Sequence, residues 1–413
     1  MYDVIIIGGG VLGCAIARSL TAQRKTVLIL EKELDVGLHA SGRGSGIVHS
    51  GFHHEPGTLA ARLCVEGNYA LKKYAESRRI PFAQIGTYAV ATDETQVPVL
   101  ERFKGWGDRN GVPNLQLVPV SHIRRQEPSI HGHRVLYSET GAVVDSRAFI
   151  KSLLNDALRA GAHILYLQEV TEIREEAEAV HVATHDDLHS AQRVVNCTGV
   201  YADRLAHSMG VGLEYRMMPF RGMYFTVRGA GSPMTQSIVY PVKEFTSPVG
   251  GVSVSKTLQG SVIVGPGFFP TVNREAYDRR QTRLKRMTTW GGQQVMWKAV
   301  IQNRRLLRLI CQKDTMAVAQ QNLWNEASQV IEGLRLQDLS PSRRVEIRPQ
   351  LIKTDGQLVD DLVIGTTDRS IHVLNMVSPG LTCSLSFAKW LTDRMQDSRY
   401  GSRFNPSTLA SVS

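Results

Sequence analysis

Close to its start the chain reads VIIIGGGVLG over residues 4–13, and this stretch decides the fold. The apolar run from Val4 to Ile7 and the Ala- and Leu-rich segment from Cys14 to Ala22 predict a strand and a helix on either side of a glycine turn. Gly8 permits the turn, Gly10 lets the backbone approach a pyrophosphate, and Gly13 allows close packing of helix on strand. The first amides of the helix then offer hydrogen-bond donors and partial positive charge to that anion.

A second apolar run supports this interpretation. Residues Thr26 to Leu30 predict another strand, and Glu31 follows it at the distance expected of an acid that binds a ribose, about 20 residues beyond the glycines. The pattern therefore predicts a Rossmann-type domain that binds an adenosine-type dinucleotide. On its own, the pattern does not separate NAD from FAD.

Two later segments favour FAD. Residues 38–51 read LHASGRGSGIVHSG, and these small side chains let backbone amides approach a flat ring such as a flavin. The apolar run from Val194 to Cys197 leads into TGVYAD at residues 198–203, where two-domain flavoproteins return to the cofactor domain.

Composition describes a globular protein with more than one domain. The chain has 413 residues, of which 42% are hydrophobic and 21% charged, and no apolar run reaches the roughly 20 residues that a membrane span needs. A strand is predicted from Tyr2 onward, so we expect no cleaved leader. The cysteines are odd in number and widely spaced, which predicts a reducing compartment and no structural metal. They are Cys14, Cys64, Cys197, Cys311 and Cys383.

The net charge of +10 suits an anionic partner, and much of it lies in one stretch. Between Arg279 and Arg308 there are nine basic and no acidic residues, interleaved with apolar ones such as Trp290 and Trp297. This composition is typical of a segment that docks on an anionic membrane surface, although a solvated helical pair would have it too. We expect no nucleic-acid partner, since no RNA-binding module is recognisable.

Nearly the whole chain resembles the D-amino-acid-oxidase-like superfamily of FAD enzymes. Within it, the chain is most similar to the branch of L-2-hydroxyglutarate dehydrogenases and oxidases, with glycerol-3-phosphate oxidases as cousins. The resemblance is carried by residues 41–51, EPGTLAARLCVEGN (55–68), PFRGMY (219–224), GSVIVGP (260–266), IRPQ (347–350) and NMVSPGLT (375–382).

The resemblance implies an α/β fold, α+β overall, in which a Rossmann-type FAD-binding domain is interleaved with a mainly antiparallel β-sheet substrate domain. We expect the FAD-binding domain at residues 1–80, 145–215 and 340–413, and the substrate domain at 81–144 and 216–339. Predicted strands of the substrate domain include Thr87 to Ala91, Met223 to Val227 and Ser261 to Val264. Apolar residues at helical spacing predict a helix from Phe149 to Ala160 that ends at Gly161.

The predicted reaction is the oxidation of a small L-2-hydroxy acid, with L-2-hydroxyglutarate first and glycerol 3-phosphate second; malate, an amino acid and a non-catalytic flavoprotein subunit stay open. Such a reaction needs a base for the hydroxyl proton, and His49, directly after the flavin-binding segment, is the candidate. The alternative is a histidine that only packs against the flavin. His53 and His54 are second-choice bases, and a place on the pocket wall or the surface fits each of them better.

An anionic substrate must also be held, and arginine meets carboxylates with two parallel hydrogen bonds. Arg348 and Arg221 are the candidates, although either could form a structural ion pair instead. Tyr240 and Lys256 are further candidates for the pocket lining, with packing or solvent exposure as the alternative. The electron acceptor is expected to be oxygen or a membrane quinone, and the protein is expected in the cytoplasm.

The C-terminal segment from Ser378 to Thr382 precedes a predicted helix through Met395, whose first amides could face the flavin; a Pro-Gly turn that caps a core helix is the alternative. The predicted cofactor-binding residues are Gly8, Gly10, Gly13, Glu31, Lys32, Ser41, Arg43, Ser45, Gly46, Thr198, Gly199, Pro379, Gly380, Leu381 and Thr382.

Overall fold

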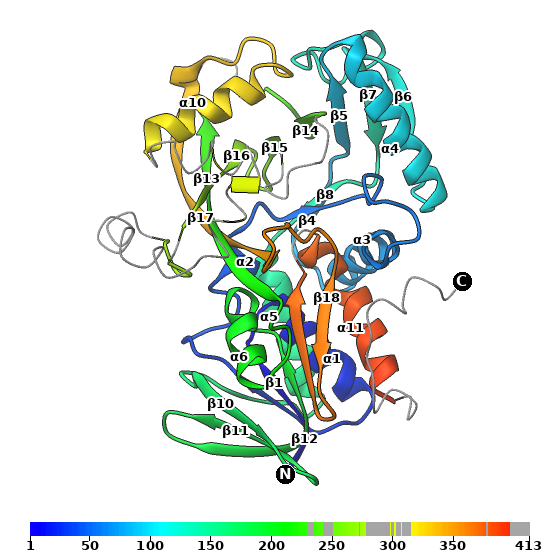
Figure 1. Ribbon diagram of the computed structural model, residues 1–413. Helices are drawn as coiled ribbons and strands as arrows, with labels where there is room; N and C mark the ends of the chain where they lie inside the picture. Colours follow the sequence, from blue (N-terminus) through cyan, green and yellow to red (C-terminus); the bar gives the residue numbers. More distant parts are fainter. Residues whose placement is uncertain are drawn as a thin grey trace.

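The computed structural model describes residues 1–229, 234–242, 251–271, 273–277, 315–376 and 379–396, together with Lys298, Ile301, Gln302 and Leu307. Within these residues, two eight-stranded sheets and a three-stranded sheet form the framework. In Figure 1 the first large sheet and its helices occupy the lower half of the molecule and the second large sheet the upper half. The predicted α/β fold is confirmed.

The first sheet is built around the strand that precedes the glycine turn. Strand β1 (Tyr2–Ile7) lies between β12 and β2, and all its pairings are parallel, as are those of β2 with β9 and β12 with β19. Because a parallel strand is covered on both faces, its sequence is continuously apolar, as in β2. The other strands of this sheet are β2 (Val27–Leu30), β9 (His163–Leu165), β10 (Val170–Glu175), β11 (Val180–Thr184), β12 (Leu188–Asn196), β18 (Val363–Thr366) and β19 (Ser370–Asn375).

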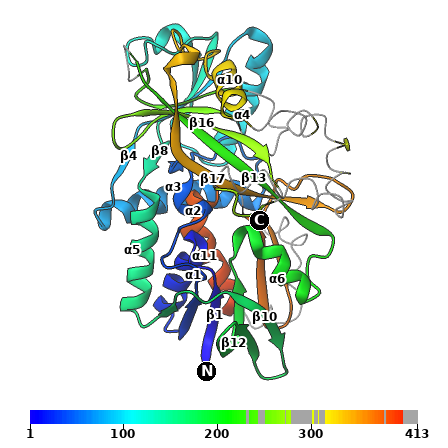
Figure 2. The ribbon, with the colours of Figure 1, turned by 90° about the vertical axis from the view of Figure 1, so that its left-hand side faces the viewer.

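Four helices share one hydrophobic core against this sheet: α1 (Val11–Ala22), α3 (Leu59–Ser77), α5 (Ser146–Arg159) and α11 (Gly380–Gln396). Figure 2 shows α1, α5 and α11 on one side of the sheet, and α6 (Ala202–Ser208) on the other. The Asp145 side chain caps α5 by accepting from the Ala148 amide, and Gly161 follows the helix with a φ of +94°. The helix predicted from Phe149 therefore begins one turn earlier.

The second sheet is antiparallel except where β14 pairs with β5, which confirms the mainly antiparallel prediction. The strand predicted from Thr87 to Ala91 is β5, whereas the one predicted from Met223 is the end of a strand of 13 residues. In order across the sheet, the strands are β17 (Leu339–Lys353), β13 (Tyr215–Val227), β16 (Val262–Pro270), β15 (Ser253–Lys256), β14 (Ile238–Pro241), β5 (Thr87–Ala91), β7 (Arg134–Ser138) and β6 (Gln116–Pro119).

Helix α10 (Met316–Ala327) packs on one face of the second sheet and α4 (Val97–Arg109) on the other, each with its own apolar core. The third sheet consists of β3 (Ile47–Val48), β8 (Ala142–Val144) and β4 (Phe82–Gln84), and lies between the two large sheets in Figure 1. Short helices complete the described elements: α2 (Ala40–Arg43) and the 3-10 turns η1 (Glu94–Gln96), η2 (Val120–His122), η3 (Gly199–Tyr201) and η4 (Leu336–Asp338).

Two predictions concern membranes. Among the described residues, none of the helices has both the length and the hydropathy to cross a bilayer. The basic stretch from Arg279 to Arg308, for which peripheral docking was predicted, lies outside the described residues except at Lys298, Ile301, Gln302 and Leu307.

Candidate active site

The glycine turn has the shape that the sequence predicted. Gly8 has a φ of +103°, and a Cβ added there would lie 2.9 Å from the Cys197 carbonyl oxygen. A Cβ at Gly13 would lie 1.9 Å from the Gly8 carbonyl oxygen, so neither position accepts a side chain. Helix α1 starts at Val11 directly after the turn, and Gly10 and Val11 line a cavity. A dinucleotide phosphate fits this arrangement because the first helical amides lie at the cavity wall.

Glu31 lies beside this turn, where a ribose-binding acid is expected. It is 6% exposed, and its Oε2 accepts from the Gly9 amide at 2.6 Å while its Oε1 accepts from the Glu33 amide at 2.9 Å. Ser41 contacts the start of the helix, since its Oγ accepts from the Val11 amide at 3.1 Å. Glu31 and Ser41 therefore both bind amides of the segment from the glycine turn to the helix start.

The small-residue segment forms part of the same cavity wall. Ser41, Ser45 and Gly46 line the cavity, and Gly46 has a φ of +77° with no room for a Cβ, which would lie 2.5 Å from the Val144 carbonyl oxygen. Arg43 is engaged elsewhere, because its Nε donates to the Leu38 carbonyl at 2.5 Å and its guanidinium lies 4.1 Å from the centre of the Tyr277 ring. The small residues thus line the cavity, while Arg43 does not and instead contacts Leu38 and Tyr277.

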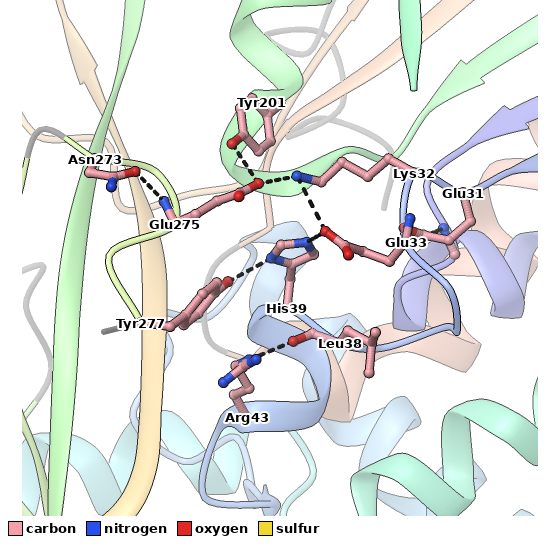
Figure 3. Close-up of polar contacts among 11 residues, drawn as sticks. Glu31, Lys32, Glu33, Leu38, His39, Arg43, Tyr201, Asn273, Glu275 and Tyr277 are labelled. Atoms are coloured by element: carbon pink, nitrogen blue, oxygen red, sulfur yellow. Dashed lines mark hydrogen bonds and ion pairs between the residues drawn. The ribbon is translucent and has the colours of Figure 1, made fainter. Parts of the chain in front are cut away.

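A polar network next to this wall holds three further residues that could ligate a metal. Glu33, His39 and Glu275 bring their ligand atoms within 4.8 Å of one another, and Figure 3 shows Lys32 between the two carboxylates. The Lys32 ammonium ion-pairs with both Glu33 and Glu275, and His39 bonds to Glu33 and to Tyr277 at 2.8 Å each. The single charge of Lys32 is shared between the two carboxylates, and Lys32 does not line the cavity.

The cavity has a volume of about 810 Å³ and is shared by the first and second sheets. This volume is in the range of sites that enclose a cofactor together with a small substrate. The sequence-predicted residues that line it are Gly10, Ser41, Ser45, Gly46, His49, Gly199, Tyr240, Arg348, Pro379, Gly380, Leu381 and Thr382. The predicted residues that are not on its wall are Gly8, Gly13, Glu31, Lys32, Arg43, Thr198, Arg221 and Lys256.

His49 follows strand β3 and lines the cavity. Burial lowers its pKa to about 4, and electrostatic interactions with His54 and Arg348 act in the same direction. The imidazole is therefore neutral at neutral pH and can accept a proton. This is the state that a general base requires before the reaction.

Two more histidines lie close to His49. The His53 ring centroid is 5.8 Å from that of His49 and 4.3 Å from that of His54. His53 lines the cavity, and burial places its pKa well below the usual range. His54 is not on the cavity wall. Of the three, His49 and His53 line the cavity, and His49, directly after β3, stays the predicted base.

Strand β17 presents three alternating charged residues, Arg344, Glu346 and Arg348, of which Glu346 and Arg348 line the cavity. The Arg344 Nη1 donates to the Gly44 carbonyl at 2.9 Å, and the Glu346 Oε1 accepts from the Tyr224 hydroxyl at 2.9 Å. Burial raises the pKa of Glu346, while the hydrogen bond from Tyr224 and the charges of Arg348 and Arg344 oppose this. The first two side chains of the row are thus engaged by the protein.

Arg348 is the side chain of this row that is left for a ligand. Its guanidinium lies 5.4 Å from the centre of the Phe268 ring, and its Nε has no hydrogen-bond partner among the described residues. Burial lowers its pKa, and the carboxylates of Glu346 and Asp360 oppose that shift through space. A half-buried guanidinium at a cavity wall is a suitable anchor for a carboxylate.

The structure does not bring the other predicted cations to the cavity. Arg221 is 2% exposed inside the second sheet, where its Nη2 lies 3.8 Å from the Met223 sulfur. Lys256 donates to the Gln236 side chain away from the cavity. Tyr240 does line the cavity, and its ring stacks on Phe52 at 6.4 Å with an interplanar angle of 14°.

Of the two later segments predicted to bind the cofactor, residues 198–199 line the cavity in part and residues 379–382 throughout. Gly199 lines it with a φ of +58°, whereas the Thr198 hydroxyl donates to the Asn196 side chain at 2.7 Å. At the other end, Pro379, Gly380 and the first residues of α11 line the cavity, as predicted from the Pro-Gly motif. Ser378 lies outside the described residues.

Residues at or next to the cavity that sequence reasoning did not assign include Tyr224, Phe268, Glu346 and Asn68. Glu346 had a usable signal, because RVEIR at residues 344–348 alternates charged and apolar residues as a strand with one charged face does. The other three had none, since their places depend on strand and helix pairings between distant segments.

The family model described as FAD-dependent oxidoreductase matches residues 3–394. Among curated proteins, the chain is 30% identical to the mitochondrial L-2-hydroxyglutarate dehydrogenase of Nematostella vectensis, covering 95% of this chain and 90% of the relative. It is 28% identical to the L-2-hydroxyglutarate dehydrogenase of Escherichia coli strain K12, covering 96% and 93%.

Among solved structures, the L-α-glycerophosphate oxidase of Mycoplasma pneumoniae with FAD bound has a TM-score of 0.75 at 23% identity, covering 94% of this chain and 93% of that one. The glycine oxidase of Geobacillus kaustophilus has a TM-score of 0.72 at 20% identity, covering 95% and 94%. At these identities the two structures show a shared fold.

Proposed function

The chain belongs to the FAD-dependent oxidoreductase family, and from this premise we propose that it oxidises L-2-hydroxyglutarate to 2-oxoglutarate. The full-length similarity to L-2-hydroxyglutarate dehydrogenases supports this substrate. The observation that carries the proposal is one cavity that joins the start of helix α1, the neutral imidazole of His49 and the available guanidinium of Arg348.

Several described residues would hold FAD. Gly8, Gly10 and Gly13 shape the turn for the pyrophosphate, with Glu31 placed for the ribose and Ser41 beside the first helical amides. The flavin would lie against Ser45, Gly46, Gly199 and residues 379–382. When bound, FAD accepts the hydride from carbon 2 of the substrate. The same proposal assigns residues 1–80, 145–215 and 340–413 to the FAD-binding domain, with residues 340–353 of the last segment lying in strand β17 of the second sheet.

The protein's own groups then have distinct roles. Arg348 binds a substrate carboxylate and fixes the hydroxyl-bearing carbon. A ring nitrogen of His49 takes the hydroxyl proton, which it can do because the imidazole is neutral. Tyr240 and Phe268 line the same cavity and exclude water from the reacting atoms.

Anaerobic reduction of the flavin tests the substrate. The purified holoenzyme is mixed with L-2-hydroxyglutarate, glycerol 3-phosphate, L-malate or a D-amino acid, and loss of flavin absorbance is followed. Rapid bleaching by L-2-hydroxyglutarate alone supports the proposal. Bleaching only by glycerol 3-phosphate would assign Arg348 to a phosphate, and no bleaching by any of them would indicate a non-catalytic flavoprotein.

The electron acceptor in this proposal is oxygen or a membrane quinone, and the place of the enzyme is the cytoplasm with peripheral membrane docking. The described cysteines Cys14, Cys64, Cys197 and Cys383 are free thiols, which suits a reducing compartment. The basic and apolar residues between Arg279 and Arg308 support docking on an anionic surface. Sedimentation with anionic vesicles tests it, and a lack of salt-sensitive binding would contradict it.

A further inference from the structure

His49 is held through its backbone by two helices that come from distant parts of the chain. Its amide donates to the Thr382 Oγ1 at 3.0 Å, and its carbonyl accepts from the Asn68 Nδ2 at 2.9 Å. The Cys64 sulfur lies 3.8 Å from the same carbonyl oxygen. Asn68 and Cys64 belong to α3, and Thr382 belongs to the first turn of α11. Both peptide groups of His49 are therefore fixed by side chains.

Asn68 is built for this contact. It is 4% exposed, and its Nδ2 donates a second hydrogen bond to the Thr140 carbonyl at 3.0 Å. An amide nitrogen has two hydrogens, so these two bonds use both of them. The side chain thereby ties His49 to the turn between β7 and β8, next to the small sheet that contains β3.

The close contact of α3 and α11 brings the two polar side chains together. A Cβ at Gly67 would lie 2.3 Å from the Thr382 carbonyl oxygen and 2.9 Å from the Cys383 Cα, so only glycine permits this approach. The Ser386 Oγ then donates to the Leu63 carbonyl at 2.7 Å across the same contact. The position of Thr382 relative to Asn68 follows from this packing.

We propose that Asn68 and Thr382 are positioning residues, which hold the His49 imidazole at the cavity wall where it meets the substrate hydroxyl. The two-residue strand β3 ends at Val48, and Gly51 with a φ of +92° turns the chain just beyond His49, so these side chains supply the restraint at this point. Restraint matters because a misplacement of about 1 Å lowers rates by about 100-fold. The inference rests on the proposed function in that His49 is taken as the base.

Thr382→Val tests it, because valine keeps the shape and removes the acceptor oxygen. Thr382→Ser restores that oxygen, and Thr392→Val is the matched control, since Thr392 is a buried threonine of the same helix whose Oγ1 bonds to Ser19 at 2.7 Å. With FAD saturating, we expect Thr382→Val to lower the limiting rate of flavin reduction by about 10- to 100-fold. The dissociation constant for L-2-hydroxyglutarate should change by less than about threefold.

The serine variant should recover the rate to within about threefold, and Thr392→Val should leave it unchanged. Asn68→Ala should lower the limiting rate about as much as Thr382→Val does. In the double variant, the fold decrease should be smaller than the product of the two single decreases, because both side chains act through one imidazole. A limiting rate in Thr382→Val equal to that of Thr392→Val would overturn the inference.

A second readout does not depend on the substrate. NMR of nitrogen-15-labelled histidine reports on the His49 ring, and the His49 signal is identified by its loss in His49→Asn. We expect Thr382→Val and Asn68→Ala to shift that signal, and Thr392→Val to leave it in place. If no 2-hydroxy acid reduces the wild-type flavin, the proposed function fails, and this signal still decides whether the two side chains hold His49. An unshifted signal in both variants would reject the positioning role.

Discussion

Replacing Arg348 by methionine is the sharpest test of substrate binding in this cavity. Methionine keeps a long apolar stem beside Phe268 and removes only the guanidinium. Within the described part of the chain, that group makes no direct ion pair, although the carboxylates of Glu346 and Asp360 act on it through space. A substrate carboxylate would form an ion pair with this guanidinium. The variant therefore removes one partner of a half-buried charge pair.

Truncation of one partner of a buried, hydrogen-bonded charge pair costs about 2–5 kcal/mol. Because 1.4 kcal/mol corresponds to a factor of ten, kcat/KM for L-2-hydroxyglutarate should fall by about 30- to 4,000-fold. The loss should be largest in substrate affinity, since Arg348 binds the carboxylate before and during the reaction. Arg348→Lys should recover only part of it, because an ammonium lacks the planar fork.

The assay is stopped-flow reduction of the flavin without oxygen at increasing substrate concentration, which separates the dissociation constant from the limiting rate. Lys256→Met is the matched control, because Lys256 was also predicted to bind substrate but bonds to Gln236 away from the cavity. We expect less than a twofold effect there. If Arg348→Met kept its affinity within about threefold, or Lys256→Met lost as much, the assignment of Arg348 would be wrong.

Three further outcomes are expected. Glu31→Gln loses the charge that accepts from the Gly9 amide, so the dissociation constant for FAD, measured by flavin fluorescence, should rise about 10- to 100-fold; an equal rise in the exposed Glu66→Gln would contradict this. Burial lowers the pKa of His372 to about 4, so the folded state binds fewer protons than the unfolded one between pH 4 and 6.5, and about 3 kcal/mol of stability is lost as the pH falls through that window. His372→Asn should flatten that part of the urea-unfolding profile, and an unchanged slope would refute the assignment. His49→Asn should lower the limiting rate of flavin reduction by about 100- to 10,000-fold with FAD still bound, and a rate near that of the wild type would exclude His49 as the base.

The sequence predicted the cofactor half of the fold because its signals are local. The glycine turn, the strand before it and Glu31 lie within about 30 residues, and their roles follow from backbone geometry alone. For the second sheet, the sequence predicted that it is mainly antiparallel but not its strand order or register. Strand β17 pairs along β13 although about 120 residues separate them, and no periodicity in either segment specifies that register.

The same distinction explains the candidate site. Arg348 and Arg221 were predicted on equal grounds, yet the register of β13 and β17 leaves Arg348 at the cavity and Arg221 inside the sheet at 2% exposure. Lys256 ends strand β15 and bonds to Gln236. Asn68 was part of a motif without a role, because its contact with His49 exists only once α3 has packed on the small sheet. Residue type was readable from sequence; the direction of each side chain was not.

His49 and Arg348 are coupled, and the coupling explains how a group with so low a pKa can serve as a base. The charge of Arg348 is one of the causes that keep the pKa of His49 near 4, after burial and the interaction with His54. A carboxylate bound to Arg348 cancels that charge, so the pKa of His49 rises when substrate enters. The free enzyme thus keeps the imidazole neutral, and substrate binding makes it more basic.

Consequently kcat/KM, which reports the free enzyme, should fall on acidification with an inflection near pH 4, whereas the inflection in kcat should lie at higher pH. In Arg348→Met the inflections of kcat/KM and kcat should lie at the same pH. Inflections at the same pH in the wild type would show that His49 and Arg348 are not coupled through the substrate.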